Sequence, residues 1–164
     1  MARNQGNKAP TQSAGTRELN LERVFDAPRD MVFRMWAEGE HMNKWSCPEG
    51  FTIPDSGGDF RPGGGWHAHM RGSDGSDHRL QGVYREIVPD ERLVFTHAWL
   101  DDKGEPGPET VVTVTFADED EDEDGKTRMK FHQGIFSSPQ SRDGHFGGWT
   151  ESFDKLADYL KELD

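Results

Sequence analysis

The end of the chain carries one apolar stripe at helical spacing, and this stripe limits what the rest of the chain can form. Its members are separated by 3, 4, 3, 4 and 3 residues: Phe146, Trp149, Phe153, Leu156, Leu160 and Leu163. That spacing places all of them on one face of a single long helix. Ser141 or Asp143 is suited to cap its start. A helix with one apolar face must bury it against another layer, which the preceding residues have to supply.

The middle of the chain supplies strands. Alternating apolar and polar residues predict strands over residues 66–71, 80–88, 92–100, 110–116 and 127–136. Short turn sequences such as Ser73-Asp74-Gly75 and Pro89-Asp90 separate them, which favours an antiparallel meander. A further short strand is expected near Phe51, among loops rich in glycine and proline.

The first ordered segment changes from strand to helix spacing. Alternation of Leu19, Leu21, Arg23 and Phe25 predicts a strand. Asp26 is suited to cap a helix with Pro28 in its first turn, and a second short helix is expected over residues 41–45. The resulting prediction is an α+β helix-grip fold, with a curved antiparallel sheet of about six or seven strands wrapped around the long C-terminal helix. The two short helices follow the first strand.

The charge of the chain argues against two classes of partner. There are 19 Lys and Arg residues against 31 Asp and Glu residues, which gives a formal net charge of −12. Without a Lys/Arg cluster we expect no nucleic-acid binding, and an acidic surface is repelled by anionic membranes. No apolar run is long enough to span a bilayer, and the first residues do not read as a signal peptide. A cytoplasmic protein is therefore expected.

Two segments hold much of this polarity. Residues 118–124 are seven consecutive acidic residues, expected to form a solvated loop between two strands. Residues 1–16 have hardly any apolar side chains and are expected to be a disordered tail, so that one domain covers residues 17–164. The single cysteine, Cys47, excludes an internal disulfide and a cysteine zinc site.

The histidines differ in the faces that the alternation gives them. His67 and His69 share one strand face, as a metal pair would. The neighbouring Trp66 takes the apolar face, so outward surface histidines are favoured over pocket-lining or metal-binding ones, and we expect no metal or cofactor. His97 alternates with Phe95 and should face the interior. There it is either a hydrogen-bonded core histidine or a polar group in a ligand cavity.

Several short motifs occur in an order that resembles one protein family. They are Val24-Phe25-Asp26-Ala27-Pro28 with Val32-Phe33 and Trp36, Trp45 with Pro48-Glu49-Gly50-Phe51, Asp59-Phe60-Arg61-Pro62-Gly63-Gly64, Gly82-Val83-Tyr84-Arg85-Glu86-Ile87-Val88-Pro89, Arg92-Leu93-Val94-Phe95, Thr127-Arg128-Met129 and Gly148-Trp149. Together these segments resemble the activator of heat-shock-protein ATPase homologue-like family, within the START-like (SRPBCC) superfamily. The resemblance implies the helix-grip fold. It also implies a small apolar molecule held between the sheet and the last helix.

Large aromatic side chains are numerous for a chain of this composition, and most are expected in the core. If the sheet curves away from the helix, a subset lines a cavity in which a few polar groups orient a ligand. The candidate cavity residues are Trp36, Trp45, Tyr84, Phe95, His97, Trp99, Gln133, Trp149 and Phe153. The sequence thus favours a binder of a small apolar or aromatic molecule without intrinsic catalysis, with the ligand entering near residues 47–58.

Two alternatives remain open at this stage. One is an enzyme of the cyclase or hydrolase type, with His97 as general base and Tyr84 as general acid. The other is an interaction module that binds a chaperone or another protein, as the family name suggests. The first needs both groups near one point of a cavity, and the second needs an exposed apolar patch or a charged groove.

Overall fold

The computed structural model describes residues 17–119 and 125–163. The predictions for the tail at residues 1–16 and for most of the acidic run, residues 120–124, lie outside the described residues. The elements in chain order are β1 (Leu19–Phe25), α1 (Arg29–Ala37), α2 (Gly39–Trp45), β2 (Phe51–Gly58), β3 (Gly65–Gly72), β4 (Asp77–Val88), β5 (Arg92–Trp99), β6 (Thr110–Asp118), β7 (Thr127–Gly134) and α3 (Pro139–Glu162).

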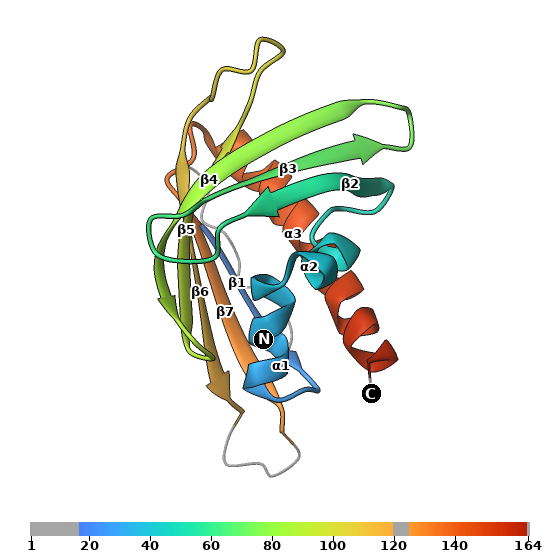
Figure 1. Ribbon diagram of the computed structural model, residues 1–164, viewed down its shortest axis with the longest axis vertical. Coiled ribbons are helices and arrows are strands. Elements are labelled where there is room, and N and C mark those ends of the chain that lie inside the picture. The colour runs from blue at the N-terminus through green and yellow to red at the C-terminus, as the bar shows by residue number, and fades with distance from the viewer. Residues whose placement is uncertain (1–16, 120–124, 164) are drawn as a thin grey trace.

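The strands form one antiparallel sheet in the order β1-β7-β6-β5-β4-β3-β2. From β2 to β7 each strand pairs with the next along the chain, and β1 joins at the far edge beside β7. The sheet curves, and α3 lies across its concave side together with the short helices α1 and α2 (Figure 1). The predicted helix-grip fold is confirmed. None of the described helices combines the length and the apolar character that a membrane crossing requires.

The strand predicted near Phe51 is longer than the glycine and proline content suggested. β2 runs from Phe51 to Gly58 as an edge strand, and its pairing with β3 is interrupted between Thr52 and Asp55. Pro54 lies inside this interruption. Proline cannot donate a backbone hydrogen bond, so an edge strand with a bulge is the place where a sheet tolerates it.

The structure corrects the ends of three elements. Pro28, rather than Asp26, is the N-cap residue of α1, and no side chain caps that helix. Ser138 caps α3 in place of Ser141 or Asp143, because its hydroxyl accepts a hydrogen bond from the Ser141 backbone N–H over 3.1 Å. Strand β7 ends at Gly134.

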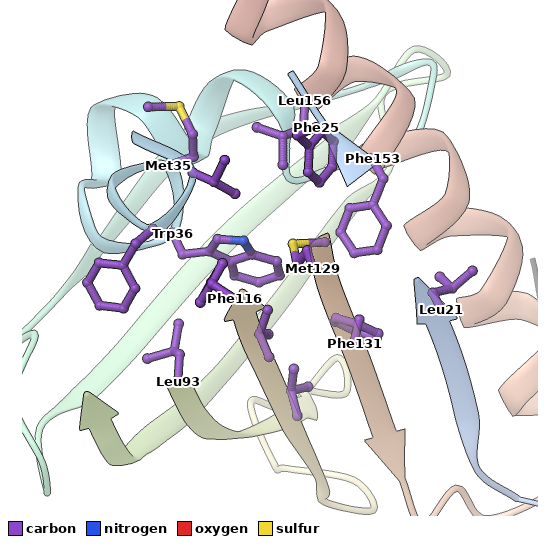
Figure 2. Close-up of a cluster of buried hydrophobic side chains, with 14 of the residues drawn as sticks. Leu21, Phe25, Met35, Trp36, Leu93, Phe116, Met129, Phe131, Phe153 and Leu156 are labelled. Carbon is purple, nitrogen blue, oxygen red and sulfur yellow. The ribbon is translucent and has the colours of Figure 1, made fainter. Parts of the chain in front are cut away.

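The space between the C-terminal half of α3 and strands β1, β6 and β7 is densely filled (Figure 2). Trp36 lies at the centre of this cluster, with its ring centroid 4.8 Å from that of Trp45. Phe131 of β7 and Phe153 of α3 meet at 5.4 Å. Leu156 and Leu160 extend the same face of α3, and both are buried. Leu163, the last member of the predicted stripe, lies beyond the end of α3 and is exposed.

Candidate functional site

A cavity of about 920 Å³ lies at the other end of the space between helix and sheet. Its walls come from β2, β3, β4 and β5, from α2, and from the N-terminal half of α3. Figure 1 shows β2, β3 and β4 curving over this part of α3. Aromatic side chains border the cavity from several of these elements: Trp36, Phe51, Phe60, Trp66, Tyr84, Phe95, Trp99 and Trp149.

The cavity stays open because α3 presents small residues to it. Ser141, Gly144, Gly148 and Ser152 border the space, and they recur at helical spacing along one face of α3. A side chain added at Gly144 would meet no heavy atom within 4 Å at its Cβ position. One turn further toward the C-terminus, the leucines of the same helix begin and the space closes. His145 and Trp149 of α3 also border the cavity, so the small residues lie between larger ones there, whereas Leu156 and Leu160 fill the space beyond it.

Six of the nine candidate residues border the cavity: Trp36, Tyr84, Phe95, His97, Trp99 and Trp149. The rings of Trp36 and Trp149 are stacked at 5.9 Å, at the boundary with the packed cluster. Trp45 and Phe153 do not border the cavity; both are fully buried in the packed cluster. Helical spacing predicted that Phe153 faces the sheet, but only the three-dimensional packing separates the filled end from the hollow one.

Gln133 also lies outside the cavity lining, in a different role from the one expected of it. It is completely buried. Its side-chain N–H donates to the Thr110 hydroxyl over 2.8 Å, and its carbonyl accepts from Trp149 Nε1 over 2.8 Å. Both ends of the amide are thus used within the protein. Gln133 holds Trp149 in place rather than offering a polar group to a ligand.

His97 and Tyr84 are the polar residues that the sequence placed correctly on the inner face. His97 is only 5% exposed. Burial, reinforced by the neighbouring His145, lowers its pKa from 6.5 to about 3, so the ring is uncharged at neutral pH. Burial also raises the pKa of Tyr84 to about 12. A proton donor and a proton acceptor work best with pKa values near the working pH. These two shifts therefore disfavour the acid–base pair that an enzyme would use.

His145 is a cavity residue whose role the sequence did not show. Its Nε2 accepts a hydrogen bond from Trp99 Nε1 over 2.8 Å. A ring nitrogen that accepts carries no proton, so Nδ1 must carry it and donate to the Ser141 backbone carbonyl over 2.8 Å. Burial lowers the pKa of His145 as well. Both ring nitrogens are occupied, and His145 fixes the orientation of Trp99 while facing His97 at 5.9 Å between ring centroids.

Three of the four tryptophans that border the cavity use their N–H groups within the protein. Trp66 donates to the Thr96 carbonyl over 3.1 Å, Trp99 donates to His145, and Trp149 donates to Gln133. Outside the cavity, Trp45 donates to the Met35 carbonyl. Trp36 Nε1 is the one buried side-chain nitrogen or oxygen without a partner in the part of the chain that the structure describes. The walls are therefore suited to apolar and stacking contacts.

The histidine pair of β3 corrects another expectation. His67 is exposed, with its ring 3.9 Å from the Asp55 carboxylate, at the rim of the cavity. His69 is buried rather than on the surface, because Asp77 covers it and accepts a hydrogen bond from its Nε2 over 2.6 Å. Asp77 also accepts from Arg71, and these bonds lower its pKa. Each histidine of the pair thus has its own carboxylate partner.

The whole fold matches known structures over most of their length. The AHSA1 protein from Silicibacter pomeroyi is 25% identical, with a TM-score of 0.80 over 90% of this chain and 99% of that chain. A protein from Chromobacterium violaceum is 29% identical, with a TM-score of 0.75 over 87% of this chain and 96% of that chain. A protein from Arthrobacter aurescens, at 22% identity and a TM-score of 0.77, shows the same fold over 90% of this chain and 87% of that chain.

A comparison with curated proteins finds no match to the chain. A comparison with protein families does find one. Residues 26–161 match the family described as activator of Hsp90 ATPase homolog 1-like protein. This range extends from the turn before α1 almost to the end of α3, and so includes the cavity and the packed cluster. The chain therefore belongs to the activator of Hsp90 ATPase homolog 1-like family, with a START-like fold.

Proposed function

We propose that the protein binds a small apolar or aromatic molecule in the cavity between the sheet and the N-terminal half of α3. The observation that carries this proposal is a space of about 920 Å³ bordered by eight aromatic side chains in a domain whose other end is densely packed. Ligand sites for small molecules commonly have this size and this mostly apolar lining. A protein that needed only stability would fill such a space, because burying apolar side chains is favourable.

The rim of the cavity supports access for a ligand. Glu40 of α2, His67 of β3 and Gly144 of α3 all border the cavity and are exposed. The connection from α2 into β2 contributes Ser46 and Pro48, and the far end of β2 contributes Gly57 and Gly58. These residues surround the region where the sequence placed the opening. We therefore assign the mouth of the site to the space between α2, β2 and the start of α3.

Binding is favoured over catalysis by the chemistry of the two polar residues. The pKa of His97 is lowered to about 3 and that of Tyr84 is raised to about 12. At neutral pH, His97 is a weak base and Tyr84 a weak acid. They retain full capacity to donate and accept hydrogen bonds as neutral groups. Their suitable role is to orient a bound molecule.

The interaction-module alternative has less support. The large hydrophobic side chains that are exposed in the described residues are Val83 on β4, Ile135 after β7 and Leu163 after α3. Docking surfaces for other proteins usually gather such residues in one patch. These three come from separate parts of the sequence and fold, and none borders the cavity.

Titration monitored by tryptophan fluorescence tests the proposal. Four of the five tryptophans border the cavity, so an aromatic ligand stacked among them changes their emission. The panel contains flat aromatic compounds and long-chain lipids, with calorimetry as a second readout. Saturable binding with one molecule per chain is expected for members of the panel. Unchanged emission and no heat for the whole panel would contradict the proposal.

A further inference from the structure

The cavity lining carries almost no charge. Glu40 is the only Asp, Glu, Lys or Arg among the described residues that border it, and it is exposed at the rim. Arg142 of α3 is buried nearby but does not border the cavity, and it forms an ion pair with Asp143 at 2.6 Å. An anionic ligand would therefore leave water without meeting a cationic side chain in the lining. Burying an unpaired charge is strongly unfavourable.

The two histidines whose rings face each other at the cavity, His97 and His145, differ in their availability to a ligand. The two nitrogens of His145 are used by Trp99 and by the Ser141 carbonyl, as described above. His97 also borders the cavity. In the described part of the molecule its ring is hydrogen-bonded to the backbone of His97 itself and to no side chain, so one ring nitrogen is left for a ligand. It is flanked by the rings of Trp66 at 5.9 Å and Trp99 at 5.5 Å. A hydrogen-bonding group thus lies between two aromatic surfaces.

The neutral state of His97 defines which ligand group fits. A neutral imidazole has one nitrogen that donates and one that accepts. A hydroxyl group can donate or accept, so it satisfies whichever nitrogen faces the cavity. A carboxylate can only accept and brings a charge with it. A hydroxyl carried on an aromatic ring would bond His97 while the ring contacts the tryptophans beside it.

We infer that the cavity selects uncharged aromatic molecules that carry a hydroxyl group, with His97 as the hydrogen-bond partner of that hydroxyl, and that it discriminates against carboxylates. This inference rests on the proposed function, since it names the class of ligand for the same cavity. It assigns His97 a role in specificity, whereas the aromatic walls supply the contact area. Tyr84 lies on the neighbouring strand, in register with Phe95 rather than with His97.

A set of four naphthalene probes tests the inference on the wild-type protein. The probes are naphthalene, 2-naphthol, 2-naphthoate and (2-naphthylmethyl)trimethylammonium, measured by calorimetry at about pH 7, where a phenol remains protonated. 2-Naphthol is expected to bind about tenfold more tightly than naphthalene, which corresponds to one hydrogen bond at the upper end of the usual range. 2-Naphthoate is expected to bind more weakly than naphthalene. The cation is expected to bind more weakly than 2-naphthol.

Variants of His97 test whether this side chain forms the hydrogen bond with the hydroxyl group of the ligand. His97→Leu keeps a buried side chain of similar size and should reduce the ratio of the affinities for 2-naphthol and naphthalene from about ten to about one, whatever the change in contact area does to both. His97→Gln retains a donor and an acceptor and should preserve part of the preference for 2-naphthol. Thermal unfolding of each variant establishes that it is folded. The unsubstituted hydrocarbon serves as the internal control for the shape of the cavity.

Each result separates this inference from the proposed function. Binding of 2-naphthoate or the cation as tightly as 2-naphthol would overturn the inference and leave the binding function intact. So would an equal loss of affinity for naphthalene and 2-naphthol in His97→Leu. Failure of all four probes and of the wider panel to bind would overturn the proposed function, and the inference with it.

Discussion

The two halves of α3 face the same sheet but present different side chains to it. The N-terminal half turns Ser141, Gly144 and Gly148 toward the sheet and leaves a cavity of about 920 Å³. The C-terminal half turns Phe153, Leu156 and Leu160 toward it, and all three are buried in the packed cluster. The difference lies in side-chain size, since one continuous helix carries both faces.

This division separates stability from binding. Burial of each large apolar side chain at the packed end stabilises the fold by about 1.5–3 kcal/mol. The hollow end gives up part of this stabilisation and gains a space bordered by aromatic rings. Trp36 and Trp149 stand at the boundary, where their stacked rings contact both regions. Substitutions at the two ends should therefore have different consequences.

The largest effect is expected at the packed end. Phe153→Ala removes a fully buried ring that contacts Phe131 and Trp36, and it leaves a void. It should lower the free energy of unfolding by about 3–5 kcal/mol. Ser152→Ala, at the neighbouring cavity-lining position, should lower it by less than about 1 kcal/mol. Urea denaturation measures both, and similar losses for the two variants would contradict the division.

The next effect concerns the link between the regions. Gln133→Leu leaves Trp149 Nε1 and the Thr110 hydroxyl without their partner in a buried place. The loss of unfolding free energy should be about 3 kcal/mol, since each orphaned group costs about 1–3 kcal/mol. Thr110→Val removes the hydrogen bond from Gln133 and the longer one, at 3.3 Å, that the hydroxyl donates to the His97 carbonyl, but it leaves the bond between Gln133 and Trp149 and should cost less. A neutral Gln133→Leu variant would show that the amide does not hold Trp149 as described.

A smaller effect is the acid sensitivity of the hollow end. The pKa of His97 falls from 6.5 to about 3 on folding, so the unfolded chain binds a proton more readily. Stability is therefore full above about pH 6.5 and declines as the pH falls from there toward 3, by roughly 1 kcal/mol for each pH unit. His145 of α3 faces His97 and shifts in the same direction.

Urea denaturation at about pH 6.5 and 4.5 measures this effect. The wild type should lose about 2 kcal/mol more than His97→Leu between these two values, because the variant lacks the group that titrates. The comparison with the variant removes the contribution of the carboxylates, which titrate in both proteins. Equal losses in the two proteins would contradict the assigned ionisation of His97.

The fold could be predicted from local patterns. The stripe from Phe146 to Leu160 identified the long helix, and the turn sequences defined the meander. Alternation along β5 correctly turned Phe95, His97 and Trp99 inward. Patterns of this kind report which face of an element a side chain takes, because that depends on neighbours in the sequence.

The site could be predicted only in part. The hydrogen bond from Trp99 to His145 joins residues 46 positions apart, and no local sequence pattern around either residue predicts this contact. The burial of His69 depends on Asp77 reaching across from β4. The sequence does contain one pattern that indicates the cavity: Ser141, Gly144, Gly148 and Ser152 recur at helical spacing within the predicted helix. That stripe of small residues marks the hollow face.

A pair of glycine substitutions on α3 tests the central claim most directly. Gly144 borders the cavity, whereas Gly147 does not, and a Cβ at either position meets no heavy atom within 4 Å. Gly144→Leu and Gly147→Leu should each stabilise the helix by up to about 1 kcal/mol, since glycine is a poor helix former. The two variants thus differ mainly in where the new side chain extends.

The deciding measurement is the affinity for 2-naphthol, by calorimetry, of these two variants and the wild type. A leucine at position 144 adds a large side chain at the border of the cavity, so Gly144→Leu should weaken binding by at least about tenfold. Gly147→Leu should bind within about twofold of the wild type. Wild-type affinity in Gly144→Leu, with the variant folded, would contradict the claim that the hollow half of α3 is the ligand site.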